Sequence, residues 1–349
     1  MSAPLCLAIN GYGRIGRCIV RALIESRYRE TMHIVAINEP ADLESMAYLT
    51  RFDSTHGVFP GEIQAIESGL RIDGRDIPVF HEREPAAVPW GRLGLDVLLE
   101  CSGAYATRER LQAFLNAGCP RLLVSNPGRG AADVDCTVVH GVNDACLRAD
   151  QHIVSAASCT TNAIVPVLDL LDRQLGVRSA FLTTLHSVMN DQPMIDGYHH
   201  SDLRRTRSAM QSIVPVTTGL AQGVERLLPQ LTGRVQAKAV RVPILNVSAI
   251  DLTVNLTQAT SVDALNTLFT DAASTCPGLL ACTRQPHASI DFNHDPHSAI
   301  IDLGQTRVNN GHFANLMVWF DNEWGFANRM LDIASGWSDL FRQIAAPSA

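Results

Sequence analysis

The sequence predicts an α/β protein with an N-terminal doubly wound parallel sheet of Rossmann type and an α+β second domain built on a mainly antiparallel sheet. Short apolar runs alternate with helical patterns in the first half of the chain, as βαβ units require. In the second half, residues 250–256 alternate between apolar and polar side chains with a period of two. The 349 residues are enough for two domains of ordinary size.

The first half begins with an apolar run at residues 5–9 that stops at Asn10-Gly11, which is typical of a buried parallel strand. Ile15, Ile19 and Leu23 then recur every four residues and predict an amphipathic helix. Further strands are predicted at residues 33–37, 95–100 and 121–125, with a helix around residues 111–115.

The second half contains a different kind of strand. Ile250, Leu252, Val254 and Leu256 alternate with polar residues, which predicts a half-solvated antiparallel strand. Residues 298–303 and 316–320 are further strand candidates, and apolar residues at helical spacing predict a C-terminal helix. We therefore expect a first domain over residues 1–158, completed by a helix at 323–349, and a second domain over residues 159–322.

The composition predicts a soluble globular protein, because 46% of the residues are hydrophobic and 18% are charged. No apolar run is long enough to span a bilayer, and no basic segment precedes the first apolar run. We therefore expect a cytoplasmic protein without a signal peptide. The net charge of −7 argues against general nucleic-acid binding.

Nine cysteines are spread along the chain without a CxxC pair, so we expect no disulfide framework and a reducing compartment. Cys6, Cys101 and Cys136 lie in apolar runs and are expected to be small buried side chains. Lys238 is the single lysine, which leaves one amine for Schiff-base chemistry. We expect no metal site either, since the spacing of His199-His200 and of His294 and His297 matches no common zinc pattern.

A cofactor site is predicted at the glycine-rich turn after the first strand. The GxGxxG pattern has a strand before it, a helix after it and an acid at the expected distance, Glu39. A carboxylate at this point binds ribose hydroxyls and repels a 2′-phosphate, so NAD is favoured over NADP. The alternative is a glycine-rich turn with an incidental glutamate. The candidate cofactor residues are Gly11, Tyr12, Gly13, Arg14, Ile15, Gly16, Glu39 and Ser125, together with Asn322, whose amide could hold a carboxamide.

A nucleophile is predicted at Cys159 in the run Ser158-Cys159-Thr160-Thr161-Asn162, which opens a helical pattern. The dipole and the unpaired N–H groups of a helix N-terminus favour a thiolate, so we expect a nucleophilic cysteine near neutral pH. His186 follows the apolar run 180–185 and is the candidate base. An inert cysteine and a satisfied core histidine are the alternatives.

Candidate anion-binding groups lie further along the chain. Guanidinium groups suit a phosphorylated substrate, and hydroxyl or backbone donors in Thr217-Thr218-Gly219 could add to them. A solvated basic face and a plain turn are the alternatives. The basic residues are Arg204, Arg205, Arg207 and Arg241.

Four segments together resemble the phosphorylating glyceraldehyde-3-phosphate dehydrogenase family, and the similarity covers nearly the whole chain. They are Ile9-Asn10-Gly11-Tyr12-Gly13-Arg14-Ile15-Gly16-Arg17, Ser158-Cys159-Thr160-Thr161-Asn162, Arg241-Val242-Pro243 and Asp321-Asn322-Glu323-Trp324-Gly325. The resemblance implies that Cys159 is the nucleophile, that His186 is its base and hydride-step partner, and that Asn322 lies at the nicotinamide. It implies anion-site positions at Ser158, Thr160, Arg207, Thr218, Gly219 and Arg241, and Arg204 of the basic cluster is a further candidate.

Within that family the chain is most similar to the branch that oxidises D-erythrose 4-phosphate. Met189 stands where the glyceraldehyde enzymes carry a threonine, and a thioether cannot donate a hydrogen bond to phosphate. Residues 202–207 lack the tryptophan and glycines of those enzymes, and residues 291–299 resemble the erythrose branch. Two features depart from that branch: Ala156 replaces an asparagine, and Thr217-Thr218-Gly219 is closer to the glyceraldehyde type.

The expected activity is therefore NAD-dependent oxidation of D-erythrose 4-phosphate to 4-phosphoerythronate through a Cys159 thiohemiacetal and an acyl thioester that water hydrolyses. The resemblance also implies a place in pyridoxal 5′-phosphate biosynthesis and a homotetramer. One alternative is a phosphorylating glyceraldehyde-3-phosphate dehydrogenase. A second is a dinucleotide-binding regulatory protein without turnover.

Overall fold

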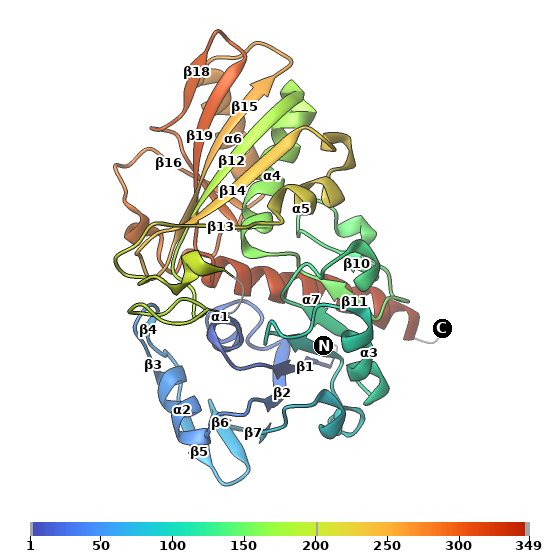
Figure 1. Ribbon diagram of the computed structural model, residues 1–349. Helices are drawn as coiled ribbons and strands as arrows, with labels where there is room; N and C mark the ends of the chain where they lie inside the picture. The colour runs from blue at the N-terminus through green and yellow to red at the C-terminus, as the bar shows by residue number, and fades with distance from the viewer. Residues whose placement is uncertain (1–2, 200–201, 346–349) are drawn as a thin grey trace. The chain divides into compact units, whose positions relative to one another are not determined.

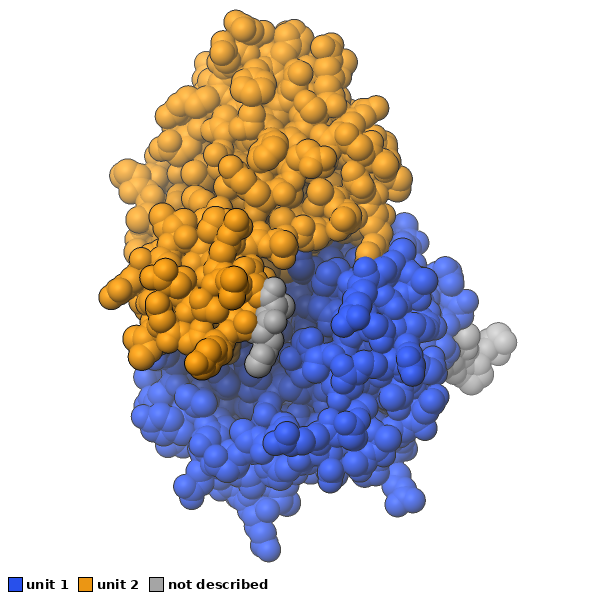
Figure 2. Space-filling model, viewed as in Figure 1, with its two compact units in different colours: residues 1–158, 326–349 blue, residues 159–325 orange. Residues whose placement is uncertain are grey.

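The computed structural model describes residues 3–199 and 202–345. The chain divides into two compact units, residues 1–158 with 326–349, and residues 159–325 (Figures 1 and 2). Each unit is built on one large sheet. The functional division into a cofactor domain and a catalytic domain stays a prediction at this point.

The first unit has a nine-stranded sheet in which seven neighbouring strands, from β10 to β7, are parallel. The predicted strands and helices of the first half are confirmed at β1, α1, β2, β8, α3 and β9. Residues 52–80 add short strands that the sequence analysis left unassigned, and β5, β6 and β7 pair antiparallel there. The strands are β1 Leu5–Asn10, β2 Met32–Asn38, β3 Phe52–Asp53, β4 Gly57–Val58, β5 Ile63–Ile66, β6 Gly69–Ile72, β7 Arg75–Phe80, β8 Val97–Glu100, β9 Leu122–Val124, β10 Cys136–Thr137 and β11 Ile153–Ser155; the helices are α1 Arg14–Glu25, α2 Leu43–Arg51 and α3 Arg108–Asn116.

The second unit has an eight-stranded sheet in which most neighbours are antiparallel, as predicted. β15 alternates buried and half-buried residues, because Asp251, Thr253 and Asn255 face the wetter side. The pairs β12–β14 and β16–β17 are parallel. The strands are β12 Val177–His186, β13 Val214–Val216, β14 Val235–Arg241, β15 Ser248–Leu256, β16 Leu280–Thr283, β17 Ala299–Asp302, β18 Arg307–Asn309 and β19 Phe313–Phe320; the helices are α4 Cys159–Leu175, α5 Leu220–Leu227 and α6 Val262–Thr275.

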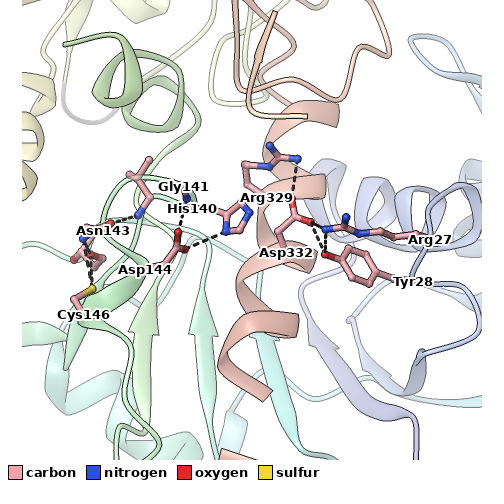
Figure 3. Close-up of polar contacts among 11 residues, drawn as sticks. Arg27, Tyr28, His140, Gly141, Asn143, Asp144, Cys146, Arg329 and Asp332 are labelled. Atoms are coloured by element: carbon pink, nitrogen blue, oxygen red, sulfur yellow. Dashed lines mark hydrogen bonds and ion pairs between the residues drawn. The ribbon is translucent and has the colours of Figure 1, made fainter. Parts of the chain in front are cut away.

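The C-terminal helix α7, Trp324–Ala345, packs its later turns into the first unit. Trp337 is fully buried and donates its indole N–H to the carbonyl of Arg148 at 3.0 Å. Asp332 accepts a 2.6 Å hydrogen bond from the Tyr28 hydroxyl and pairs with Arg329 at 2.7 Å (Figure 3). The helix is therefore an integral part of the first unit's core.

The expected burial of three cysteines is wrong, because Cys6, Cys101 and Cys136 are all half-buried. Cys136 is half-buried and forms a disulfide with Cys146, although we expected a small buried side chain and no disulfide. Asn143, within the same loop, donates to the Thr137 carbonyl at 2.8 Å and contacts the Cys146 sulfur at 3.5 Å (Figure 3). The loop fold brings the two sulfurs together, and the spacing of cysteines in the sequence carries no signal for such a pairing.

Candidate active site

Cys159 is the first residue of α4, as the sequence predicts. Ala157, two residues earlier, has a φ of 60°, a left-handed conformation that is uncommon for residues other than glycine. This tight turn leads from β11 into the helix. The Cys159 sulfur lies 3.8 Å from the Thr160 hydroxyl oxygen and 3.8 Å from His186 Nε2. The fold therefore brings the predicted nucleophile and the predicted base together.

His186 is the last residue of β12 and is 8% exposed. The parallel partner strand β14 places Arg241 directly opposite it in the register. His186 Nδ1 lies 2.9 Å from the Ser187 carbonyl oxygen and 3.0 Å from an Arg241 guanidinium nitrogen. The Ser187 carbonyl favours the tautomer with hydrogen on Nδ1, which leaves Nε2 as an acceptor facing Cys159, whereas the Arg241 N–H, which can only donate, favours the opposite tautomer.

The His186 pKa is lowered to about 4, chiefly by burial and then by the positive charge of Arg241. The imidazole is therefore neutral at neutral pH. A neutral ring with a free Nε2 lone pair can accept a proton, whereas an imidazolium could not.

Burial also raises the pKa of the Cys159 thiol above its ordinary value. Thr160, backbone N–H groups and the Arg241 charge oppose this shift without overcoming it. The expectation of a stable thiolate near neutral pH is thus wrong for this state of the protein, because desolvation outweighs the helix terminus. The resting pair is a neutral thiol beside a neutral imidazole.

The basic cluster does not act as one group. Arg205 is half-buried and pairs with Asp191 at 2.8 Å. Burial lowers the pKa values of both His186 and Arg241, and the negative charge of Asp191 opposes this lowering without overcoming it. Arg204 and Arg207 are exposed, and Arg207 pairs with Asp196 at 2.9 Å on the surface. Arg205 is thus linked to this site through Asp191 and through its charge interaction with Arg241, whereas the predicted substrate residues Arg204 and Arg207 are exposed.

Thr218 and Gly219 lie at the start of α5, with Gly219 at the N-cap. The Thr218 hydroxyl accepts a hydrogen bond from the Leu220 N–H at 3.2 Å. A Cβ placed on Gly223 would meet the Thr161 hydroxyl at 3.4 Å, so the first turns of α5 and α4 lie close together. Two helix N-termini side by side form a setting that favours an anion.

Met189 lies in the turn after His186 and is 45% exposed. Its backbone N–H donates to the Gln192 side chain at 3.3 Å, and its carbonyl accepts from the Gln192 N–H at 2.9 Å. The turn therefore leaves the thioether open to solvent, where it can accept a hydrogen bond weakly but cannot donate one.

Asn322 follows β19 and is 9% exposed. Its side-chain oxygen accepts hydrogen bonds from the hydroxyls of Ser187, at 3.0 Å, and Ser248, at 2.7 Å. With the oxygen held in this way, the amide NH₂ is presented as a donor. The sequence carries no local signal for the two serines, because Ser187 directly follows β12 and Ser248 begins β15.

The glycine turn of the first unit has the geometry of a dinucleotide-phosphate site. Gly11 has a φ of 88°, and a Cβ at Gly16 would overlap the Gly11 carbonyl oxygen. A Cβ at Gly13, the N-cap of α1, would meet no described atom within 4 Å. The turn is thus closed on its inner side and open over the helix N-terminus, which fits a pyrophosphate.

The other candidate cofactor residues lie around this turn. Glu39 follows β2, and its carboxylate accepts from the Tyr12 N–H at 2.7 Å, which places the acid beside the turn. The Tyr12 ring is buried, so this residue offers the turn its main chain. The Arg14 guanidinium binds the Asp53 carboxylate through its two terminal nitrogens, at 2.5 and 3.1 Å. Ile15 and Ser125 are half-buried, and Ser125 follows β9 at the same sheet edge.

The histidines considered for a metal have other contacts. His294 stacks on Trp324 with a 3.5 Å centroid separation, and His297 Nδ1 lies 2.7 Å from an Asp295 carboxylate oxygen. His199 Nδ1 accepts from the Asp202 N–H at 3.2 Å, whereas His200 lies outside the described residues.

Among residues 3–199 and 202–345, no helix has the length and apolar character needed to cross a membrane.

Two segments of the sequence match models of known protein families. Residues 5–108 match the NAD binding domain of glyceraldehyde 3-phosphate dehydrogenase. Residues 158–322 match the C-terminal domain of glyceraldehyde 3-phosphate dehydrogenase. The first match covers the glycine turn and Glu39, and the second covers Cys159, His186, Arg241 and Asn322.

Proposed function

The chain belongs to the glyceraldehyde-3-phosphate dehydrogenase family of NAD-dependent enzymes that oxidise phosphorylated aldehydes, and from that premise we propose that it converts D-erythrose 4-phosphate to 4-phosphoerythronate. The observation that carries the choice is Met189, an exposed thioether three residues after His186, where glyceraldehyde enzymes carry a threonine. We assign NAD binding to the first unit and the aldehyde chemistry to the second.

Cys159 begins the reaction by attack of its sulfur on the aldehyde carbon. The thiol proton passes through His186 Nε2, 3.8 Å from the sulfur, to the aldehyde oxygen and gives a thiohemiacetal. Backbone N–H groups at the start of α4 stabilise the negative charge on that oxygen during attack.

His186 then removes the hydroxyl proton of the thiohemiacetal as the carbon is oxidised. NAD, when bound, supplies the acceptor for the hydride, and the Asn322 NH₂ is oriented to hold its carboxamide. The product on the protein is an acyl thioester of Cys159. Because the His186 pKa is about 4, the proton it accepts is readily lost to solvent.

Water completes the cycle. His186, neutral again, accepts a proton from a water that attacks the thioester carbonyl. The Cys159 sulfur leaves and takes this proton back from His186, which restores the neutral pair, and the released acid ionises to the carboxylate. The net reaction consumes one aldehyde, one NAD and one water, and yields the carboxylate, NADH and two protons.

The phosphate of the substrate needs cationic and hydrogen-bonding groups. We assign this role to Arg241 and Arg205, together with donors at the starts of α4 and α5. From the resemblance, Ser158, Thr160, Thr218 and Gly219 stay as proposed anion contacts. Arg204 and Arg207, both exposed, stay with them as weaker proposals.

A direct assay separates this proposal from its main alternative. NADH formation is measured with D-erythrose 4-phosphate and with glyceraldehyde 3-phosphate, each with and without added phosphate. We expect the four-carbon substrate to have the higher kcat/KM, and its rate to be independent of phosphate. A poor rate with erythrose 4-phosphate, together with phosphate-dependent turnover of the three-carbon aldehyde, would overturn the proposal.

The phosphorylating alternative has one observation in its favour, the adjoining helix N-termini that carry Thr160 and Thr218-Gly219. They could bind an attacking phosphate as well as a substrate phosphate.

A regulatory protein without turnover is the other alternative. It predicts that Cys159→Ala leaves the measured function unchanged, whereas our mechanism predicts loss of dehydrogenase activity.

The remaining assignments come from the resemblance and are proposals. We place the reaction in the cytoplasm and in pyridoxal 5′-phosphate biosynthesis, and we propose a homotetramer. Support for an oligomer comes from large apolar side chains between residues 194 and 213 that are exposed in the single chain. They include Met194, Ile195, Leu203 and Ile213, each at least 70% exposed. Light scattering after size-exclusion chromatography tests the stoichiometry.

A further inference from the structure

A buried chain of polar side chains lies at the carboxyl ends of three neighbouring strands in the first unit, next to the glycine turn. Asn38 ends β2, Asn10 ends β1 and Glu100 ends β8, and all three are at most 5% exposed. Asn38 donates to the Asn10 side-chain oxygen at 2.7 Å, and Asn10 donates to Glu100 Oε2 at 2.5 Å. Ser102 donates to Glu100 Oε1 through its backbone N–H, at 2.8 Å, and through its hydroxyl. We call these four residues the strand-end network.

Backbone N–H groups fix the direction of the hydrogen bonds that Asn38 and Asn10 make in this network. The backbone N–H of Glu82 donates to the Asn38 side-chain oxygen at 2.9 Å, and an N–H can only donate. Asn38 must then present its NH₂ to Asn10, and Asn10 must present its NH₂ to Glu100 Oε2. The Ser102 N–H is an equally fixed donor to Oε1. Oε2 of Glu100 therefore faces an NH₂ group and Oε1 faces a backbone N–H, both of which can only donate, while the Ser102 hydroxyl beside Oε1 can also accept. A carboxylate satisfies all of these donors.

The strand-end network contacts the glycine turn directly. The Gly11 N–H donates to the Asn38 carbonyl at 2.9 Å, and the Cys101 N–H donates to the Asn10 carbonyl at 2.8 Å. A Cβ at Gly11 would lie 2.5 Å from the Ser102 nitrogen. The segment that carries Ser102 is therefore packed against the start of the turn, so a shift in one displaces the other.

We propose that Glu100 is a positioning residue for NAD: as a carboxylate it completes the strand-end network and holds the Gly11–Gly16 turn in its binding shape, and uptake of a proton by Glu100 weakens NAD binding. A proton on Oε2 would oppose the Asn10 NH₂, whereas a proton on Oε1 can be donated to the Ser102 hydroxyl oxygen. In the second case the hydrogen bond between Ser102 and Glu100 reverses, the Ser102 hydroxyl hydrogen must turn away from Glu100, and the bond from the Ser102 N–H to the neutral acid beside Gly11 is weaker. The inference rests on NAD binding by the family and not on the identity of the aldehyde.

The protonation change falls in an accessible pH range. Burial raises the pKa of Glu100 to about 7, against the lowering effect of its hydrogen bonds from Ser102 and Asn10. The titratable neighbours that interact with it are Cys101 and Tyr105, and burial raises the pKa of both, so both stay neutral from pH 6 to 8. If the ionised form alone binds NAD, the Kd at pH 6 is about tenfold higher than at pH 8.

Titration calorimetry with NAD and no aldehyde tests the proposal between pH 6 and 8.5. Glu100→Gln leaves a single accepting oxygen, so one fixed donor must face an NH₂ group. Glu82→Gln is the matched control, because the Glu82 side chain is exposed and the residue joins the network through its main chain. His81→Gln removes the imidazole that contacts the Glu39 carbonyl at 2.8 Å, and so isolates a histidine contribution.

We expect the wild-type, Glu82→Gln and His81→Gln proteins to show the rise in Kd below pH 7. Glu100→Gln, which has no ionised form, should bind well over tenfold more weakly than wild type at pH 8, with little further change at pH 6. A wild-type Kd that is constant from pH 6 to 8, a slope lost in His81→Gln, or wild-type binding and slope in Glu100→Gln would each overturn the proposal. Circular dichroism checks the fold of Glu100→Gln. If that variant misfolds, the pH dependence of the NAD Kd in the wild-type, Glu82→Gln and His81→Gln proteins still tests the proposal. Because aldehyde is absent, failure here is distinct from failure of the substrate assignment.

Discussion

Single residues around Cys159 decide how its thiol becomes a nucleophile. Burial raises the pKa of the Cys159 thiol and, together with the positive charge of Arg241, lowers the pKa of His186 to about 4. The Arg241 charge also opposes the rise in the thiol pKa. A thiolate–imidazolium pair is therefore not the resting state. The proton moves when the aldehyde arrives, with neutral His186 as its carrier.

The pH dependence of Cys159 alkylation tests this resting state. His186 is neutral above about pH 4, so no imidazolium supports a thiolate between pH 5 and 7. The rate with iodoacetamide should rise about tenfold per pH unit from pH 6 to 8, as the thiolate fraction of a raised-pKa thiol does. Cys159→Ser reports the background from other cysteines. A rate plateau between pH 5.5 and 7 would instead indicate a preformed ion pair.

Arg205 is the arginine of the basic cluster that we expect to bind substrate phosphate. Loss of a charged hydrogen bond costs about 1.5–3 kcal/mol, so Arg205→Ala should raise the KM for the aldehyde phosphate about 10- to 100-fold. Arg207→Ala, which removes an exposed partner of Asp196, is the control and should change KM less than about twofold. Equal effects of the two substitutions would remove the distinction between them.

Met189 is the residue that we connect to the choice between water and phosphate. Met189→Thr adds a donor in the turn after His186 and should strengthen phosphate binding by about 1.5 kcal/mol, roughly tenfold. Turnover should then respond to added phosphate. Met210→Thr is a matched control because Met210 is 43% exposed against 45% for Met189. Phosphate-independent turnover in Met189→Thr would show that this residue does not determine whether water or phosphate accepts the acyl group.

Secondary-structure elements explain which of these features could be read from the sequence. The period of two at β15 and the spacing in α1 are local signals, and both elements were predicted where they occur. Cys159 and His186 were placed at a helix start and a strand end by the same local logic. Their 3.8 Å approach was not readable, because it depends on how α4 packs on the sheet.

The misjudged features depend on tertiary contacts. Arg204, Arg205 and Arg207 are similar in sequence, and the short helical turn at residues 203–206 and its contact with Asp191 decide which one faces inward. The Cys136–Cys146 bond depends on the path of a loop. The thiol pKa depends on desolvation, which a helix-terminus argument leaves out.

Helix α6 offers a test of the fold that is independent of the chemistry. Ser261 caps its N-terminus by accepting the Ala264 N–H at 3.1 Å. Ser261→Ala should lower the free energy of unfolding by about 1 kcal/mol, with kcat/KM unchanged. Ser274→Ala, on the exposed last turn, is the control and should have a smaller effect. Denaturant unfolding measures both, and no loss in Ser261→Ala would contradict the cap.

The whole molecule consists of two compact units with separate proposed roles, so a ligand of one should stabilise that one first. NAD at 100 times its Kd adds about 2.7 kcal/mol to the stability of the unit that binds it. Hydrogen exchange should slow chiefly in peptides from residues 5–108, which match the NAD binding domain. Protection confined to residues 159–325 would contradict the assignment.

The central claim is that Cys159 carries an acyl group from D-erythrose 4-phosphate that water releases. Phosphorus NMR of the reaction with NAD, run with and without added phosphate, follows this step directly. We expect a single monophosphate product, 4-phosphoerythronate, formed at the same rate in both samples. An additional acyl-phosphate signal, with turnover that depends on added phosphate, would contradict it.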